Sequence, residues 1–411
     1  MNAGRRAATV LSAVLAAALV VWGAFAVPSD MDEFAPLHLL SCRYLYAPLH
    51  TFREGCGGGA ETLRFGAFEY QRAYAYVGAT SSALYFPIWR MWASPRSFYA
   101  LGIVLLALFA VGLTRALRLP LRDALIPLSC FPIVYLFIHD TGPIRLAFLS
   151  LPAFVLLWRG ALRRPAPWRQ LAYGVAAGVV AVVCTEDKPF YLVVSPLIGL
   201  CAVAGVTWEG GHGDRVTTAD ALRRGWLFLV ALATVASSGI SVLLFGGRDG
   251  NGNTYYQVIR GIGSEHLSTL GFQIKRIVVF TLLPAMNAHR VFGWDHALIF
   301  ASTPALVPAG VLVWFAVRRR ALDRVAVFWL GGAYAVGAAV FLATHVASEA
   351  HHYVFLLLPI LVALMMIASR SEAAWRMVMA CAAASSVLAM AALTWHAPTP
   401  SSSRERDRFF E

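Results

Sequence analysis

Charged side chains are scarce in this sequence, and lysine is nearly absent. Asp, Glu, Lys and Arg make up 14% of the 411 residues, whereas a soluble domain averages about 25%. Only Lys188 and Lys275 are lysine among the 34 basic residues. Hydrophobic residues make up 59% and the mean hydropathy is +0.64, which excludes an ordinary soluble enzyme. Apolar runs of about 18–22 residues are long enough to cross a bilayer as helices, and they predict an all-α polytopic membrane protein.

Several common catalytic motifs are also missing. The six cysteines include no Cys-x-x-Cys pair, which excludes a zinc ribbon or a redox motif of that type. Neither a P-loop, nor a nucleophile elbow, nor a His-Glu-x-x-His helix occurs. The glycine-rich tract 246–253 lacks the preceding strand and the spacing of a dinucleotide fingerprint, so we interpret it as a linker. No basic patch with interleaved aromatic residues suggests nucleic acid as a partner.

The first apolar run, Ala7–Val27, follows Arg5 and Arg6. Ala24-Phe25-Ala26 resembles a signal-peptide cleavage site, but the apolar stretch is long for a signal peptide, and we favour a retained signal-anchor helix. Further candidate spans lie near 98–117, 123–138, 145–158, 171–184, 190–207, 225–245, 298–317, 325–344, 353–369 and 375–395.

Arginine distinguishes the two sides of the predicted bundle. With the amino terminus in the cytoplasm, the cytoplasmic turns hold Arg115, Arg118, Arg122, Arg159, Arg163, Arg164, Arg169, Arg215, Arg223, Arg224, Arg318, Arg319, Arg320, Arg324, Arg370 and Arg376. The short outer turns hold only Arg145 and Lys188 as Arg or Lys. Following the positive-inside rule, we predict about eleven spans with the carboxyl terminus outside. Residues 1–411 would form a single transmembrane domain with two long outer loops, 28–96 and 246–297.

Histidine and carboxylate show the opposite asymmetry. Every histidine except His212 falls outside in this topology. The acids that fall inside are Asp123, Glu209, Asp214, Asp220, Asp323 and Glu372. Titratable groups gathered on one face indicate a binding or catalytic site there. The alternative is that the outer loops are simply longer.

The first long outer loop opens with Asp30, Asp32 and Glu33, directly after the first helix. Its later part, 65–92, is rich in aromatic residues, and we expect amphipathic helices at the membrane surface. They would form either an anchoring aromatic belt or a roof over a lipid-linked substrate, and the two are compatible. Whether Cys42 and Cys56 form a disulfide in this loop stays open.

Three short outer turns are dense in polar residues. They cover 139–145, with Asp140 and Arg145; 185–189, with Glu186, Asp187 and Lys188; and 345–353, with Glu349, His351, His352 and Tyr353. The second long outer loop adds Arg290. Ionisable groups at a helix end are costly to desolvate. Each turn alone fits interfacial snorkelling as well as catalysis, but their location on one face favours a shared site.

Paired carboxylates beside scattered cations suit transfer from an anionic donor to a hydroxyl or amine. Asp32 can accept the acceptor's proton, with Asp30 as its competitor, and Glu33 beside it would raise its pKa. A departing phosphate needs cations where its charge develops. The candidates for the phosphate are Lys188, Arg145, His352, His351 and Arg290, and those for other substrate contacts are Asp140, Glu349, Tyr353, Glu186 and Asp187. Because no nucleotide site is present on the cytoplasmic side, a lipid-carried donor is expected.

These residues resemble the GT-C superfamily of membrane glycosyltransferases, which includes protein O-mannosyltransferases and the aminoarabinose transferase of lipid A. Asp32-Glu33 occupies the place of the family's acidic motif after the first helix. The segment 352–359, His-Tyr-Val-Phe-Leu-Leu-Leu-Pro, is similar to a late family module in which the residue before the tyrosine is usually basic. Residues 185–189 resemble a helix-end segment of several members.

The resemblance implies an inverting transfer from a polyprenyl-phosphate-linked sugar to a lipid, glycan or protein acceptor, on the outer face of a bacterial plasma (inner) membrane. Asp32 would be the general base, while Lys188, Arg145 and His352 would stabilise the lipid phosphate. Family members differ in their need for a divalent metal. No tight His/Asp spacing commits this sequence to one, so we expect no cofactor. The alternatives are a multispanning transporter or glycan flippase and a non-enzymatic envelope scaffold.

Overall fold

The computed structural model describes residues 3–26, 61–65, 68–72, 80–92, 95–139, 144–163, 166–186, 222–248, 251–254, 256–257, 331–335, 338–339 and 357–395. Over these residues the chain is mainly helical, with one two-stranded hairpin. The predicted all-α class is therefore wrong for a short part of the first outer loop and agrees with the remaining named elements.

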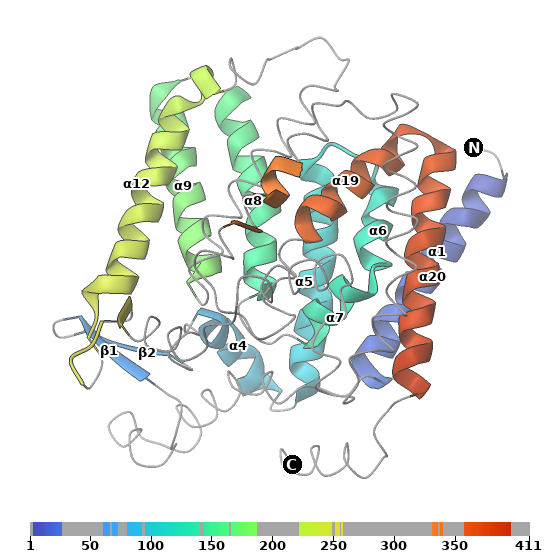
Figure 1. The fold of residues 1–411 in the computed structure, drawn as a ribbon, viewed down its shortest axis with the longest axis horizontal. Helices are drawn as coiled ribbons and strands as arrows, with labels where there is room; N and C mark the ends of the chain where they lie inside the picture. Colours follow the sequence, from blue (N-terminus) through green and yellow to red (C-terminus); the bar gives the residue numbers. More distant parts are fainter. Residues whose placement is uncertain are drawn as a thin grey trace.

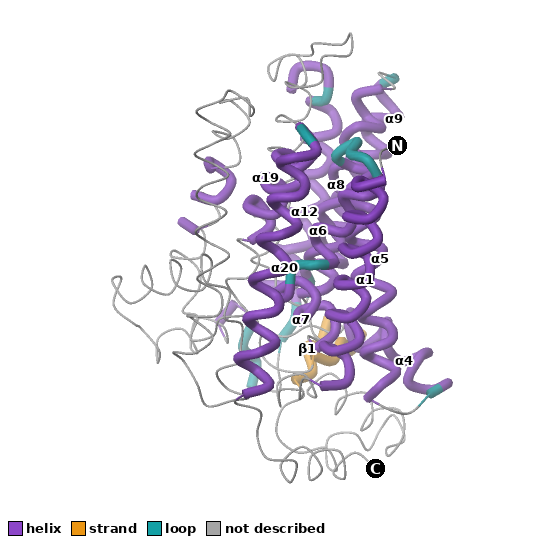
Figure 2. Tube along the Cα trace, turned by 90° about the vertical axis from the view of Figure 1, so that its right-hand side faces the viewer, coloured by secondary structure: helices purple, strands orange, loops and turns teal. Residues whose placement is uncertain are grey.

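The long helices lie side by side and roughly parallel (Figures 1 and 2). The named helices are α1 (Ala3–Ala26), α4 (Thr80–Met91), α5 (Pro95–Ala116), the 3-10 turn η3 (Leu121–Ala124), α6 (Leu125–Leu128), α7 (Phe131–His139), α8 (Ile144–Arg163), α9 (Pro167–Thr185), α12 (Trp226–Ser241), the π-helical turn η4 (Val242–Gly246), α19 (Leu357–Arg370) and α20 (Glu372–Trp395). In both views α4 and the hairpin lie at the lower end, and the turn between α19 and α20 lies at the upper end.

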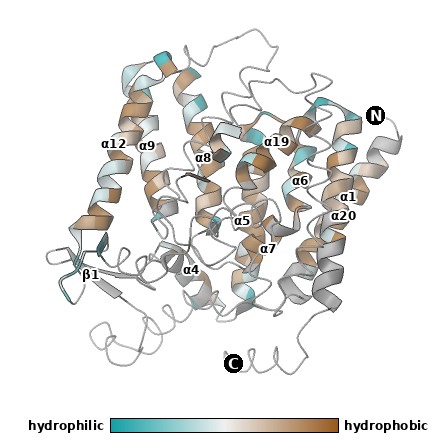
Figure 3. Cartoon of the chain, in the orientation of Figure 1, coloured by the Kyte–Doolittle hydropathy of each residue, from teal (hydrophilic) through white to brown (hydrophobic). Residues whose placement is uncertain are grey.

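Four of the described helices are long and apolar enough to cross a membrane: Arg96–Ala116, Arg145–Arg163, Pro167–Cys184 and Trp226–Gly246. Ala7–Trp22 and Leu358–Arg370 are shorter apolar helices. Hydrophobic residues predominate along α5 and α12, while hydrophilic residues gather at ends such as the α19–α20 turn (Figure 3). The predicted spans 190–207 and 298–317 and most of 325–344 lie outside the described residues, so the number of about eleven stays a prediction.

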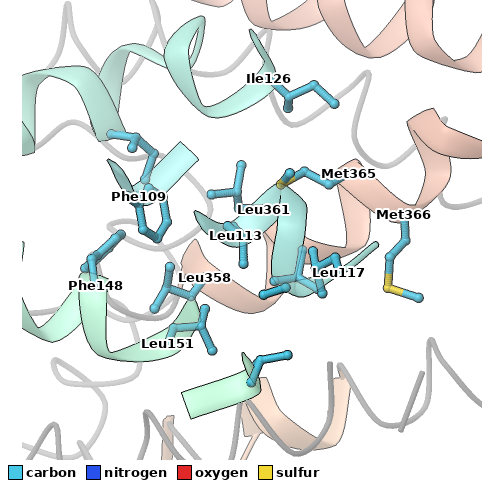
Figure 4. Close-up of a cluster of buried hydrophobic side chains, with 14 of the residues drawn as sticks. Phe109, Leu113, Leu117, Ile126, Phe148, Leu151, Leu358, Leu361, Met365 and Met366 are labelled. Carbon is cyan, nitrogen blue, oxygen red and sulfur yellow. The ribbon is translucent and has the colours of Figure 1, made fainter. Parts of the chain in front are cut away.

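The apolar core forms where α5, α7, α8 and α19 meet. On α5, Leu106, Phe109 and Leu113 recur at helical spacing, so they form one face, and all three are fully buried. The Phe109 ring stacks on Phe137 of α7 at a centroid distance of 5.2 Å and lies 5.6 Å from the Phe148 ring of α8. Helix α19 closes the cluster from another side with the side chains of Leu358, Leu361 and Met365 (Figure 4).

Glycines allow α9 and α12 to approach closely. A Cβ atom added to Gly174 would lie 2.5 Å from the Phe228 carbonyl oxygen and 2.7 Å from the Ala231 Cβ. One turn further along, a Cβ on Gly178 would lie 2.6 Å from the Val235 Cβ. Small residues four apart let helix backbones come together inside a bilayer, where apolar burial alone gives no drive to associate. The two helices therefore form a tightly packed pair.

The predicted span 123–138 is not one helix but two short ones, α6 and α7, separated at Ser129 and Cys130. Pro132 suits the start of α7, because a backbone N–H in the first turn of a helix has no partner within that helix and proline lacks one. The Ile133 N–H donates to Cys130 at 3.0 Å, which leaves the Ser129 carbonyl without a helical donor. The Ser386 hydroxyl of α20 donates a hydrogen bond to the freed Ser129 carbonyl at 2.7 Å. Ser129 is fully buried and Ser386 nearly so, as a broken helix at membrane depth requires.

The first outer loop contains the hairpin in place of part of the expected amphipathic helix. Strand β1 (Glu61–Phe65) pairs antiparallel with β2 (Phe68–Arg72), and the register places Glu61 opposite Arg72 and Arg64 opposite Glu69. Only two residues connect the strands, and the first is glycine, which is a pattern typical of tight hairpins. The amphipathic helix predicted over 65–92 therefore begins only at Thr80, as α4.

Candidate functional site

The described helices have two polar ends of different composition. We call the end that holds α4, the start of α8 and the end of α9 the outer end, in keeping with the predicted topology. The opposite end, with the end of α5, η3 and the start of α20, is the inner end. Two of the predicted site residues, Arg145 and Glu186, are described, and both lie at the outer end.

Arg145 begins α8, and its side chain is completely buried. Its Nη2 donates a hydrogen bond to the Ile138 carbonyl oxygen in the last turn of α7 at 2.5 Å. Its Nη1 donates to the Tyr85 hydroxyl of α4 at 3.2 Å and to the Phe98 carbonyl oxygen of α5 at 3.5 Å. The guanidinium carbon also lies 5.7 Å from the centre of the Tyr85 ring. One side chain thus joins four helices.

The described partners of the Arg145 guanidinium are all formally neutral. They are two carbonyl oxygens, a hydroxyl and an aromatic ring, and Nε is buried without a hydrogen-bond partner among the described residues. A buried ionised side chain is expensive unless it is paired, and such residues commonly mark functional sites. Arg145 therefore retains a donor that an anion could use.

Glu186 follows the last turn of α9, and only 6% of it is exposed. Its Oε2 accepts hydrogen bonds from the Thr80 backbone N–H at 3.1 Å and from the Thr80 hydroxyl at 2.8 Å. Thr80 is the first residue of α4, where a backbone N–H has no partner within the helix. A carboxylate at this position also interacts favourably with the helix dipole. Glu186 therefore caps α4 from a different part of the chain.

Helix α4 contacts one described residue from each of two predicted outer turns, Arg145 and Glu186. Tyr85 contacts Arg145 near the middle of α4, and Thr80 contacts Glu186 at its start. Tyr85 is 1% exposed, whereas Leu84 is 51% exposed and Met91 is 80% exposed, so α4 buries one face and leaves another open. An α4 packed in this way covers Arg145.

The remaining predicted site residues lie outside the described residues, and their roles stay predictions. They are Asp30, Asp32, Glu33, Asp140, Asp187, Lys188, Arg290, Glu349, His351, His352 and Tyr353, together with the cysteine pair Cys42 and Cys56.

Thr80 is not predicted from the sequence to take part in the site, and Tyr85 is predicted only as one of the aromatic residues of an anchoring belt or a roof over the substrate. For Thr80, a signal is present, because Thr80-Ser81-Ser82 before an apolar run is typical of a helix start. For Tyr85, no sequence signal singles it out from the neighbouring aromatic residues. Its contact with Arg145 depends on how α4 packs against α5, where the Tyr85 ring lies 5.1 Å from that of Phe98.

The inner end contains a second polar cluster. Nη1 of Arg122 lies 2.6 Å from Oε2 of Glu372, and Nε of Arg376 lies 3.4 Å from Oε1 of the same carboxylate. Asp123 is fully buried, with its Oδ1 3.7 Å from Nε of Arg122. Burial raises the pKa of Asp123 from 3.8 to about 6, while the Arg122 charge and the neighbouring Trp375 indole act to lower it. The cluster joins η3 to the start of α20.

At the inner end, hydrogen bonds also cap the last turn of α5. Arg118 adopts a φ of 57°, and two hydrogen bonds close the turn, from the Leu119 N–H to Thr114 and from the Arg118 N–H to Arg115. This is the pattern of a Schellman motif, whose left-handed residue is usually glycine. Nη1 of Arg159 in α8 donates to the Ala116 carbonyl oxygen of the same turn. Arginines that the topology explains by orientation thus also cap helix ends.

Within the described part of the chain, no three His, Cys, Asp or Glu residues lie close enough together to hold a metal ion.

Comparisons with known proteins give one similar structure. No protein-family model and no curated protein sequence matches the chain. The crystal structure of the Archaeoglobus fulgidus oligosaccharyltransferase, in complex with zinc and sulfate, aligns with 98% of this chain at 15% identity and a TM-score of 0.44. The alignment covers 56% of that protein, so this chain spans little more than half of its length. A likeness at this TM-score assigns neither fold nor activity to the chain.

Proposed function

We propose that this chain is a membrane glycosyltransferase that moves a sugar from a polyprenyl-phosphate donor to an acceptor at the outer end of the helices. The observation that carries the proposal is the junction at α4, where Arg145 and Glu186 come from two separate outer turns. Both turns are dense in ionisable groups in the sequence. Their meeting at one helix supports a common site beside the loop that begins with Asp30, Asp32 and Glu33.

In this proposal, Asp32 accepts the proton of the acceptor hydroxyl or amine, with Glu33 beside it and Asp30 as the alternative base. The acceptor attacks the anomeric carbon from the side opposite the lipid phosphate. The bond between that carbon and the phosphate oxygen breaks, and the polyprenyl phosphate leaves. Lys188 and His352 stabilise the charge that develops on it.

The wider set of predicted residues completes the site. Arg145, His351 and Arg290 would add to the phosphate contacts, while Asp140, Glu186, Asp187, Glu349 and Tyr353 would bind other parts of the substrates. The protein would lie in the bacterial plasma (inner) membrane with this site on the extracytoplasmic face.

The break between α6 and α7 favours a second candidate, a transporter or lipid-linked glycan flippase. Transporters often build their substrate sites from discontinuous helices near the bilayer midplane. In this chain, however, the Ser386 hydroxyl donates a hydrogen bond to the carbonyl at the break, that of Ser129, and both serines are buried. That carbonyl is therefore not available to a substrate. The ionisable side chains that meet in the structure lie at the ends of the helices instead, which suits chemistry at the membrane surface.

The purified protein, supplied with polyprenyl-phosphate sugars and candidate acceptors, tests the proposal. Asp32→Asn keeps the size of the side chain but removes the base, and we expect transfer to fall by about a hundredfold or more. Asp123→Asn makes the same substitution at the inner end and should leave transfer unchanged. Transfer at the wild-type rate in Asp32→Asn would remove Asp32 as the base. Movement of the lipid-linked sugar across a vesicle membrane without transfer would favour the flippase.

A further inference from the structure

Helix α4 binds one polar atom of each of two residues that the proposed function assigns to substrate. Arg145 gives a hydrogen bond to Tyr85, and Glu186 accepts two from Thr80. Both side chains are buried beneath or against α4, with exposures of 0% and 6%. A substrate could reach neither of them while α4 holds this position. We therefore propose that α4 is a lid that competes with the donor phosphate for Arg145, and that the Thr80–Glu186 contact is the latch that holds it closed.

The chemistry at Arg145 favours an anion over the lid. In the closed position, Arg145 binds the Tyr85 hydroxyl and two carbonyl oxygens, and its Nε has no hydrogen-bond partner among the described residues. A guanidinium presents its N–H donors as a flat fork that matches phosphate oxygens, and an anion adds a charge–charge attraction that a neutral hydroxyl or carbonyl lacks. A phosphate monoanion or dianion that binds Nη1 would thus replace the Tyr85 hydroxyl with a stronger partner.

The latch involves only the first turn of α4. Glu186 binds both the N–H and the hydroxyl of Thr80, so the first turn of α4 depends on a residue at the end of α9. Pro87 stands inside α4 and removes one of its own hydrogen bonds. Exposed neighbours such as Leu84 and Met91 give the helix little packing on its other side. Elements with few buried contacts are the ones that open most readily.

If α4 is such a lid, its opening should change the affinity for the donor phosphate. When the binding-competent state is only partly populated, the apparent dissociation constant rises in proportion, and loosening the lid lowers it. Removing a latch contact should therefore tighten binding of the donor phosphate. If Glu186 instead bound substrate directly and Thr80 had no part in it, removing the Thr80 hydroxyl would leave affinity unchanged. The identity of the anion rests on the proposed function, whereas the closed lid does not.

The latch can be measured without any substrate by hydrogen–deuterium exchange on the full-length protein in lipid nanodiscs. We expect the backbone amides of the first turn of α4 to exchange about tenfold faster in Thr80→Ala and in Glu186→Gln, because a hydrogen bond to a charged group is lost or weakened. Thr80→Ser keeps the hydroxyl and should exchange as the wild type does. Glu372→Gln, which alters a carboxylate at the inner end, is the matched control. Equal exchange in Thr80→Ala and the wild type would overturn the latch.

Binding of a polyprenyl monophosphate tests the competition at Arg145. Thr80→Ala, which changes no charge, should bind it several-fold more tightly than the wild type, and Thr80→Ser should not. Inorganic phosphate is run in parallel, so that tighter binding of both probes indicates a site for the phosphate group itself. Unchanged or weaker binding in Thr80→Ala refutes the competition. If no variant binds the polyprenyl phosphate, the donor class in the proposed function is wrong, and the exchange experiment still decides whether α4 is latched.

Discussion

Replacing Gly174 with alanine would place a methyl group where α9 and α12 leave no room for one. The new Cβ would lie 2.5 Å from the Phe228 carbonyl oxygen and 2.7 Å from the Ala231 Cβ. The first obstacle is backbone, so a change of side-chain rotamer cannot relieve it. The two helices would have to separate by roughly 0.8 Å to restore ordinary contacts, and overpacking of this kind costs about 1–3 kcal/mol.

Alanine is also the better helix former, and that gain acts against the clash. Glycine in a helix interior is less favourable than alanine by about 0.5–1 kcal/mol. For Gly174→Ala, we therefore expect a net loss of about 1–2 kcal/mol in the free energy of unfolding, from the difference between the two effects. Gly112→Ala in α5 is the matched control, because its Cβ would lie 3.4 Å from the Pro152 Cβ, an ordinary contact. That variant should be neutral or slightly more stable.

Thermal unfolding in detergent, followed by the loss of monodisperse protein, compares the two variants. Gly174→Ala should melt a few degrees below the wild type, since 1 kcal/mol corresponds to about 2–4 °C in a medium-sized protein. Gly112→Ala should melt at or above the wild-type temperature. If both alanine variants behave alike, α9 and α12 do not pack as closely as described.

Three further predictions concern the inner end and the broken helix. Asp123→Asn should raise the free energy of unfolding at pH 7 by about 1–3 kcal/mol, because ionising a carboxyl whose pKa is raised from 3.8 to about 6 opposes folding. The folded wild type binds the proton more tightly, so its stability should fall as pH rises from about 4 to about 6, and Asp123→Asn should lose that dependence in melting curves recorded across this range. Arg118→Gly should stabilise by about 0.5–1 kcal/mol, because glycine adopts the φ of 57° without strain, and Arg118→Ala should not. Ser386→Ala should cost about 1–3 kcal/mol by leaving the buried Ser129 carbonyl without its donor, as measured by thermal unfolding.

For each of these three predictions, one result would contradict the physical reason given for it. A melting temperature of Asp123→Asn that follows pH as the wild type does would mean that another group titrates in that range. Equal gains in Arg118→Gly and Arg118→Ala would attribute the effect to the lost charge instead of the backbone. Ser237→Ala, which removes an exposed hydroxyl from α12, controls for Ser386→Ala, and equal losses in both would exclude a special role for the buried bond.

The sequence predicted the helical framework because apolar periodicity and arginine-rich turns are local signals. The described helices α5, α8, α9, α12, α19 and α20 all overlap predicted spans. Among the described residues, arginines expected on one side do lie at one end, where Arg122 pairs with Glu372 and Arg159 caps α5. The break at Ser129 was missed because the run 123–138 is apolar throughout, although Pro132 marks it.

The arrangement at the outer end could not be read from the sequence in the same way. Arg145 is predicted to bind a phosphate because it is a cation in an outer turn dense in polar residues, but its burial depends on how α4 packs against α5 and reaches Arg145 through Tyr85. The bond between Thr80 and Glu186 joins residues far apart in the chain, and neither residue type predicts the other. Aromatic residues over 65–92 suit both strand and amphipathic helix, so the hairpin was taken for helix. Such long-range contacts are set by packing, not by local pattern.

Cross-linking can measure directly whether Asp32 and Lys188 share one site at the outer end. Cysteines are placed at both positions in a background without native cysteines, and a membrane-impermeant bifunctional maleimide is added to intact cells. We predict an intramolecular cross-link between positions 32 and 188, and none between 32 and a cysteine at position 212, which is expected in the cytoplasm. Labelling of position 212 from outside, or two accessible cysteines at 32 and 188 that never cross-link, would contradict a common outer site.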